Sequence, residues 1–237
     1  MSEPGVLTKA ATIVLGVALL SGGAAHTETL QPVTHPEELG FDVARLERLT
    51  SLFQADAEAG RIPGAVVLIA RHDQVAYLRA FGYQDRDTKI PMKPDSIFRI
   101  ASMTKPVISV AAMMLAEEGK LDIAAPVSQY LPEFKELQVR VDWSNAGSRS
   151  TEAMLEPQRR PMTVQDLMRH TSGLVYPPPL GEGPVQNAYL EADLANRDET
   201  LAQMVTKLSK LPLAHQPGEV WEYSIATDVL GRVIEVA

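Results

Sequence analysis

The run at residues 107–116 is the feature that most constrains the fold, because Ser109 is its only polar residue. A helix that is apolar on nearly every side is expected to be buried on nearly every side. Ser102 and Lys105 stand at its start, and residues three apart lie on one helical face. Such a pair can form a nucleophile and its base. A Ser-x-x-Lys spacing also arises by chance, so the apolar setting is what favours catalysis.

Composition excludes several other classes of protein. The formal net charge is -8, whereas a nucleic-acid surface needs clustered positive charge. Cysteine is absent, which removes disulfides, thiolate catalysis and cysteine-based zinc sites. The histidines have no metal-ligand spacing: His26, His35, His72, His170 and His215. We therefore expect no cofactor, no metal and no nucleic-acid partner, and we make no prediction about the oligomeric state.

The N-terminus resembles an export signal. Lys9 precedes the apolar run 10–20, which is too short to span a bilayer but fits the central region of a signal peptide. Gly23 and Ala25 supply small residues before a cleavage site. We predict a signal peptide over 1–25 and a periplasmic or secreted protein without a stable membrane anchor. The alternative is an uncleaved, buried or disordered segment of a cytoplasmic protein.

Hydrophobic periodicity predicts a helix packed on an antiparallel sheet in the first part of the chain. A helix is expected over 41–59, capped by Asp42 and ended by Gly60. Strands are expected over 65–70 and 75–81, joined by a polar turn.

The second part of the chain is predicted to be mainly helical. A capping box at Thr163 is expected to begin a short helix that ends near Gly173. Further helices are expected over 198–210 and from Ser224 onward. Residues 142–160 and 175–187 are expected to be loops, because they are polar or rich in proline and glycine.

Ser102 lies where free backbone N–H groups at a helix start can stabilise an oxyanion. A lysine acting as a base must be neutral, and burial of Lys105 in an apolar helix is expected to lower its pKa. The alternative is a serine cap with a lysine that extends to solvent. Tyr223 can relay a proton if nearby cations lower its pKa, but its local sequence also suits an ordinary packed aromatic residue.

Several stretches, in order, resemble the serine beta-lactamase and penicillin-binding-protein superfamily, and most closely class C beta-lactamases and the family VIII carboxylesterases. The matching stretches are 97–105 (IFRIASMTK), 131–134 (LPEF), 170–174 (HTSGL), 216–218 (QPG) and 221–224 (WEYS). The resemblance covers about residues 36–237. It implies that Ser102 is acylated and that Tyr223 is the general base. It also implies that Lys105 either accepts the proton of Ser102 or holds the hydrogen-bond network of the site. It also implies a structural role for residues 170–174 and an oxyanion donor at the Ser102 N–H.

Two departures from the family pattern bear on function. Ile225 stands where beta-lactamases usually carry an asparagine that contacts the substrate amide, which favours the esterase branch. The family's third motif lies on a strand well after the tyrosine, whereas this sequence ends 14 residues after Tyr223. We therefore expect a fragment or truncated frame with an incomplete sheet.

The sequence thus predicts an α/β (α+β type) fold of the beta-lactamase/transpeptidase kind, with an antiparallel sheet flanked by helices and a further helical region. The predicted domain spans 26–237 and lacks the third motif. The predicted function is hydrolysis of small esters through an acyl-enzyme, with weak beta-lactam hydrolysis. The alternatives are a true beta-lactamase, a D-Ala-D-Ala carboxypeptidase acting on an amide, and a non-catalytic acyl-binding module or inactive fragment.

Overall fold

The computed structural model describes residues 31–32, 35–141 and 154–237. The predicted signal peptide over 1–25 and most of the predicted loop over 142–160 lie outside these ranges. The chain divides into two compact units, Met1–Phe98 and Arg99–Ala237, and the predicted domain from residue 26 extends over both. In the described residues, no helix is both long and apolar enough to cross a membrane.

The first unit is a sheet with a helix on one face. Its main strands are β2 (Gly64–Arg71) and β3 (Gln74–Asp85), which pair antiparallel, and the short strands β1 (Gln31–Pro32) and β4 (Ile90–Pro91) also pair with β3. The turn between β2 and β3 places His72 and Asp73 at positive φ, as tight hairpins require. These strands confirm the predictions over 65–70 and 75–81.

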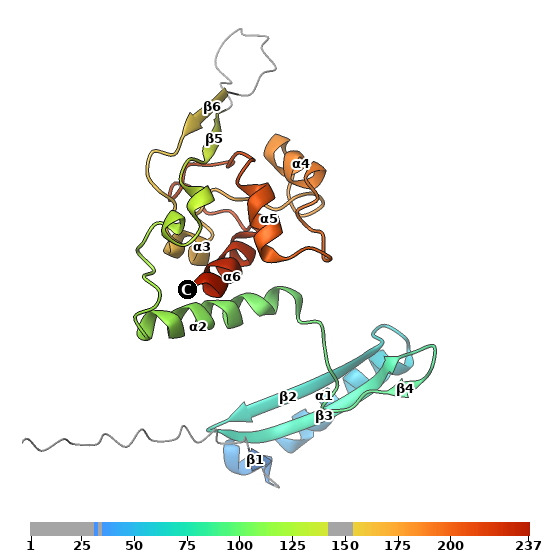
Figure 1. Ribbon diagram of the computed structural model, residues 1–237. Helices are drawn as coiled ribbons and strands as arrows, with labels where there is room; N and C mark the ends of the chain where they lie inside the picture. Colours follow the sequence, from blue (N-terminus) through green and yellow to red (C-terminus); the bar gives the residue numbers. More distant parts are fainter. Residues whose placement is uncertain (1–30, 33–34, 142–153) are drawn as a thin grey trace, which may run out of the picture. The chain divides into compact units, whose positions relative to one another are not determined.

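Helix α1 (Val43–Glu58) confirms the prediction over 41–59 and packs on the sheet (Figure 1). The Asp42 carboxylate caps it by accepting from the Arg45 N–H at 3.1 Å. Leu46 of the helix is buried with Tyr77 and Phe81 of β3, and the ring of Phe53 stacks on Phe81 at 5.4 Å. These apolar contacts are the core of the first unit.

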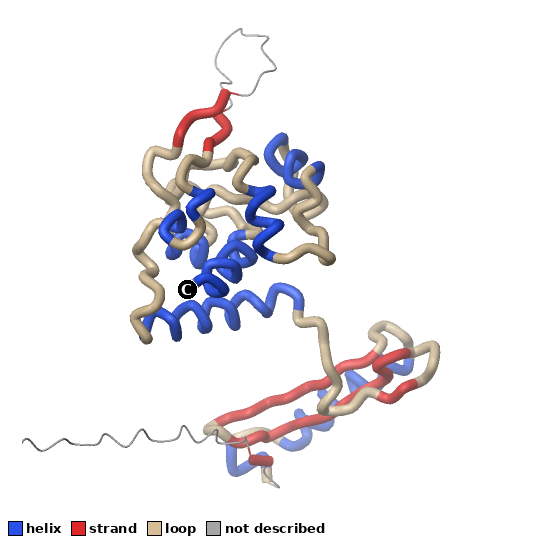
Figure 2. Tube along the Cα trace, viewed as in Figure 1, coloured by secondary structure: helices blue, strands red, loops and turns tan. Residues whose placement is uncertain are grey.

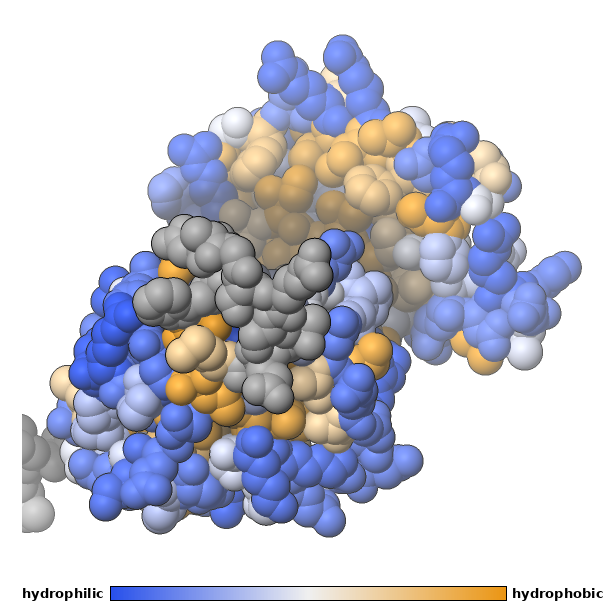
Figure 3. Space-filling view, turned by 90° about the horizontal axis from the view of Figure 1, so that it is seen from above, coloured by the Kyte–Doolittle hydropathy of each residue, from blue (hydrophilic) through white to orange (hydrophobic). Residues whose placement is uncertain are grey.

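The opposite face of the β2–β3 hairpin is apolar and exposed. Leu68 and Leu78 are directly paired and remain 52% and 40% accessible. Figure 3 shows hydrophobic residues gathered on this unit, which is the fainter of the two bodies in that view.

The second unit is mainly helical, with one small hairpin (Figure 2). Several of its helices pack against the last one, α6, whose Val229, Leu230 and Val233 are fully buried. The helices are α2 (Thr104–Glu117), α3 (Val164–Arg169), α4 (Pro184–Glu191), α5 (Leu201–Leu208) and α6 (Ala226–Val236). Short 3-10 turns lie at Ala101–Met103, Val127–Gln129 and Pro132–Phe134.

Several predicted boundaries in this unit were wrong. Part of the predicted loop 142–160 forms β6 (Met154–Pro157), which pairs with β5 (Gln138–Val141). The predicted loop 175–187 ends earlier than expected, since α4 begins at Pro184. Proline suits the first turn of a helix. Helix α5 begins only at Leu201, since Thr200 is its capping residue.

Within the second unit, the apolar helix is covered on one side. In α2 only Ala112 is fully buried, and Ile108 and Leu115 pack against the core. Val107 and Val110 are each 59% accessible. One face of the helix packs against α6, whereas no described residue of the unit covers the other.

The predicted capping box is present, and an ion pair between the buried Asp166 and the exposed Arg160 supports it. Asp166 accepts from the Thr163 N–H and hydroxyl, from the Thr171 hydroxyl, and from both guanidinium nitrogens of Arg160 at 2.7 and 2.8 Å. The helix ends at Arg169 rather than near Gly173, because His170 adopts the left-handed conformation. Burial opposes the charge of Asp166, but these donors outweigh it and lower the pKa of the carboxyl to about 2.

This shift predicts acid sensitivity. The folded-state pKa of Asp166 lies below its ordinary value of 3.8, so its contribution is complete above about pH 4 and is lost as the pH falls toward 2. We expect Asp166→Asn to lower the free energy of unfolding by about 2 kcal/mol more at pH 6 than at pH 2. Urea unfolding across this range measures the difference.

Asp198→Asn is the matched control, because it removes an exposed carboxylate of the same unit. An equal pH dependence of the free energy of unfolding in both variants would contradict the stabilising role assigned to Asp166.

Candidate active site

Ser102 lies in the 3-10 turn Ala101–Met103 that leads directly into α2. The residue before it, Ala101, has a φ of 46°, a left-handed conformation that side chains rarely adopt. Strain of this kind costs about 1–3 kcal/mol and persists where the surrounding chain enforces it. The turn leaves Ser102 exposed at the start of the helix, where the positive end of the helix dipole lies.

The structure brings the three predicted site residues together. The Tyr223 hydroxyl lies 2.6 Å from Ser102 Oγ, and Lys105 Nζ lies 3.3 Å from the same oxygen. Lys105 Nζ also lies 4.7 Å from the centre of the Tyr223 ring. One hydroxyl is therefore within hydrogen-bond reach of both an ammonium group and a phenol.

Tyr176 is a fourth member that the sequence analysis missed. Its hydroxyl accepts a hydrogen bond from Lys105 Nζ at 3.0 Å, and its ring lies 5.4 Å from that of Tyr223. Tyr176 follows the segment 170–174 and precedes a run of prolines, and nothing in that local pattern connects it with Lys105. Only the folded chain places the two residues side by side.

The charge state predicted for Lys105 was wrong. Burial alone would lower its pKa, but the hydrogen bonds with Tyr176 and Tyr223 outweigh burial and raise it. Lys105 is therefore an ammonium group at neutral pH. In turn, the hydrogen bonds from Lys105 and Ser102 lower the pKa of Tyr223, as the sequence analysis expected of nearby cations. The cation thus favours the phenolate form of the tyrosine.

The segment 170–174 holds Tyr223 in place. The carbonyl of His170 accepts from the Glu222 N–H at 2.9 Å, and the Ser224 N–H donates to His170 Nδ1 at 3.3 Å. The His170 ring lies 4.9 Å from the Tyr223 ring. Burial, followed by the charge of Lys105, lowers the pKa of His170. A neutral His170 therefore binds the residues just before and just after the tyrosine, Glu222 and Ser224, and fixes the position of Tyr223.

A cavity of about 550 Å³ opens beside Ser102 and Lys105. Arg197 and Asp228 both lie on its wall. Burial raises the pKa of Asp228, and the nearby Lys105 opposes that shift. In the described ranges, no three acidic, histidine or cysteine side chains converge on a common point. The arrangement suits nucleophilic attack by Ser102 on a ligand in this cavity, assisted by Tyr223.

Comparisons with known proteins place this geometry in context. The model of the family described as Beta-lactamase matches residues 49–237. Esterase EstB of Burkholderia gladioli is 35% identical over 204 residues, which are 85% of this chain and 48% of that protein. Protein Rv1367c of Mycobacterium tuberculosis is 37% identical over 177 residues, 75% of this chain and 42% of that protein. The chain therefore spans about half the length of these relatives.

Two solved structures are also similar to this chain. EstCE1, described as a hydrolase with promiscuous acyltransferase activity, matches with a TM-score of 0.63 and 35% identity over 80% of this chain and 46% of that one. The simvastatin synthase LovD of Aspergillus terreus matches with a TM-score of 0.62 and 26% identity over 81% of this chain and 46% of that one.

The site geometry predicts how Tyr223 ionises. We expect its phenol to titrate below the ordinary pKa of 10, and Lys105→Met to raise that pKa because the stabilising cation is lost. Ultraviolet difference titration of the wild type against Tyr223→Phe isolates this phenol.

Lys120→Met is the control, since Lys120 pairs with Glu118 on the surface. If Lys105→Met leaves the titration of Tyr223 unchanged, Lys105 does not control the ionisation of this phenol.

Proposed function

The chain belongs to the beta-lactamase family, and from this premise we propose that it is a serine hydrolase of small esters. The observation that carries the proposal is the hydrogen-bonded set of Ser102, Lys105 and Tyr223. Each member has a chemical task that follows from its distance and charge. The relative named as an esterase supports the choice of esters.

The proposed reaction begins with Tyr223 in its phenolate form, which the Lys105 ammonium stabilises. Ser102 Oγ attacks the ester carbonyl carbon while its proton passes to the phenolate oxygen, 2.6 Å away. The oxyanion develops near the positive start of α2. As the ester C–O bond breaks, Tyr223 returns the proton to the leaving alcohol.

The acyl-enzyme is then hydrolysed, and Tyr223 again accepts a proton and returns it. Water loses a proton to Tyr223 as its oxygen attacks the acyl carbon, and the proton returns to Ser102 Oγ as the acid departs. An alcohol in place of water would give a new ester. Tyr176 donates nothing to the reacting atoms and instead orients Lys105.

The residue two positions after the tyrosine favours esters over beta-lactams. Ile225 is buried and has no polar side-chain atom, so it cannot bind a substrate amide as an asparagine would. A site that lacks a polar partner for an amide loses affinity for that group. We propose that beta-lactam hydrolysis is at most a weak side activity.

This proposal predicts a clear substrate preference. We expect turnover of para-nitrophenyl butyrate above background and much slower turnover of nitrocefin. Lys105→Ala and Tyr223→Phe are each expected to lower kcat for the butyrate at least 100-fold, because the first removes the cation that stabilises the phenolate and the second removes the hydroxyl that carries the proton. Spectrophotometric assays of both substrates measure the preference, and circular dichroism checks that the variants fold.

Labelling with a fluorophosphonate provides the control for the nucleophile. Intact mass should rise by one adduct in the wild type and remain unchanged in Ser102→Ala. Folded wild-type protein without an adduct at Ser102 would refute the enzymatic function, and fast nitrocefin turnover without ester turnover would refute the esterase assignment.

We also propose export to the periplasm or the outside of the cell, on the basis of Lys9 and the apolar run 10–20. Cleavage after Ala25 is expected to give a mature N-terminus at His26. Sequencing the N-terminus of the protein from a periplasmic or secreted fraction tests this, and an intact Met1 would contradict it.

A further inference from the structure

Tyr223 lies in a segment that has no regular secondary structure. Residues 220–224 form neither helix nor strand, and the side chain of Tyr223 is exposed. Proton transfer to this phenol depends on its 2.6 Å separation from Ser102 Oγ, and a displacement of about 1 Å near the reacting atoms costs up to about 100-fold in rate. Contacts outside the site must therefore hold this segment, and the residue next to Tyr223 makes several of them.

Glu222 is bound through its backbone and through both oxygens of its carboxylate. Its N–H donates to the carbonyl of His170 at 2.9 Å. Its Oε2 lies 2.5 Å from His215 Nε2, and its Oε1 accepts a longer hydrogen bond from Gln186 Nε2 at 3.4 Å. Because a planar peptide fixes consecutive Cα atoms about 3.8 Å apart, these contacts also restrict the backbone of Tyr223.

Both partners of this carboxylate are held by their own surroundings. Gln186 of α4 is 8% accessible, and Gly183 lies so close that a Cβ there would come within 2.6 Å of Gln186 Oε1. His215 follows Ala214, whose N–H donates to the carbonyl of Gly173 at 2.9 Å. A Cβ on Gly173 would lie 2.1 Å from the His215 carbonyl oxygen, so this approach requires glycine. The carboxylate is therefore attached to two fixed segments of the chain.

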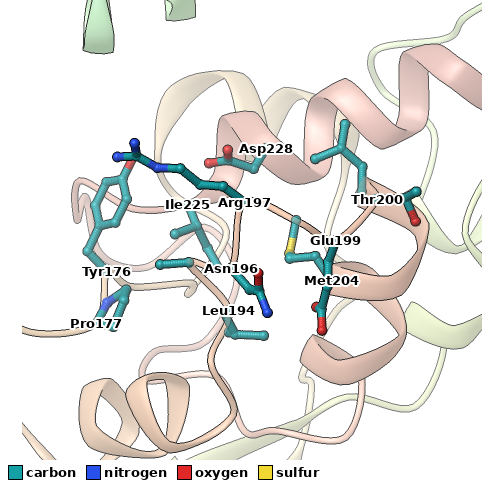
Figure 4. Close-up of a pocket in the computed structure, with 12 residues that line it drawn as sticks. Tyr176, Pro177, Leu194, Asn196, Arg197, Glu199, Thr200, Met204, Ile225 and Asp228 are labelled. Atoms are coloured by element: carbon teal, nitrogen blue, oxygen red, sulfur yellow. The ribbon is translucent and has the colours of Figure 1, made fainter.

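Glu222 lies outside the walls of the cavities described for this unit. It lines neither the cavity beside Ser102 nor a neighbouring one of about 400 Å³, whose lining is drawn in Figure 4. The charges that act on the pKa of Tyr223 are those of Lys105 and Asp228. An effect of Glu222 on the reaction therefore has to come from where it holds its neighbour rather than from contact with a substrate.

From these contacts we propose that Glu222 is a positioning residue for Tyr223. Its carboxylate connects His215 with Gln186 and holds the phenol within reach of Ser102 Oγ. The proposal rests on the esterase function above and adds the residue that keeps its base in place. When the bridge is removed, the phenol moves away from Ser102 and proton transfer slows.

The kinetics of para-nitrophenyl butyrate hydrolysis provide the first test. We expect Glu222→Ala to lower kcat about 10- to 100-fold, because the shift reaches the reacting atoms. KM is expected to change by less than about twofold, since Glu222 lines neither cavity. Glu222→Gln keeps an acceptor oxygen for His215 and is expected to restore kcat to within about fivefold of the wild type.

A double-mutant cycle identifies the partner. His215→Ala is expected to lower kcat as well, and its addition to Glu222→Ala is expected to lower kcat no further, because both residues share one contact. Glu219→Ala is the matched control, since Glu219 lies three residues earlier and pairs with Arg159 at 2.9 Å instead. Its kcat is expected to match the wild type. Circular dichroism and thermal unfolding check that every variant is folded at the assay temperature.

Titration of the Tyr223 phenol is a spectroscopic test that requires no ester. In Glu222→Ala we expect its pKa to rise toward the ordinary value of 10, because the phenol lies farther from Lys105. Ultraviolet difference titration against Tyr223→Phe in the same background measures this pKa. In Glu219→Ala it is expected to equal that of the wild type.

Four results would overturn the proposal: a kcat in Glu222→Ala equal to that of Glu219→Ala, a loss in Glu222→Gln as large as in Glu222→Ala, additive losses in the double mutant, or an unchanged titration of Tyr223 in Glu222→Ala. Failure of the esterase function is seen separately, as the absence of Ser102-dependent labelling and ester turnover in the wild-type protein, and the titration then still decides the role of Glu222.

Discussion

The arrangement at the site depends on one ammonium group that is shared between two phenols. Lys105 Nζ donates to Tyr176 at 3.0 Å and to Ser102 at 3.3 Å, and it lies close to the ring of Tyr223. A cation held in this way keeps its proton, and its charge favours the phenolate of Tyr223. The charge of the lysine therefore favours the form of Tyr223 that can accept a proton, as the proposed reaction requires.

Three separate segments must meet for that interaction to form. Helix α2 supplies Ser102 and Lys105, the loop after α3 supplies Tyr176, and the segment before α6 supplies Tyr223. The packing of α2, α3 and α5 around α6 fixes these segments, and the pairing of the buried Asp166 with Arg160 secures the start of α3. The stability of this unit and the geometry of the candidate site are thus linked through the packing around α6.

Local pattern was sufficient for much of the fold and for part of the site. The β2–β3 hairpin, α1 and the capping box at Thr163 were predicted because their signals lie within a few residues of one another. The family motifs led to Ser102, Lys105 and Tyr223, and the family assignment is confirmed by the match over 49–237. Tyr176 could not be predicted, because its partner Lys105 lies 71 positions away and is reached only through the packing of α2.

The error about the charge of Lys105 has a physical origin in what surrounds the lysine. Composition reports that a helix has apolar faces, but burial depends on which faces the surrounding chain covers. In α2 one side packs on α6, while Val107 and Val110 remain largely accessible, and in the first unit Leu68 and Leu78 are likewise uncovered. The sequence analysis considered burial alone, and the pKa of Lys105 was therefore expected to fall. Desolvation is indeed its largest single influence, but the combined effect of two phenols reverses the direction. For a lysine at a helix start, the identity of its hydrogen-bond partners therefore decides its charge more than the hydrophobicity of its own helix.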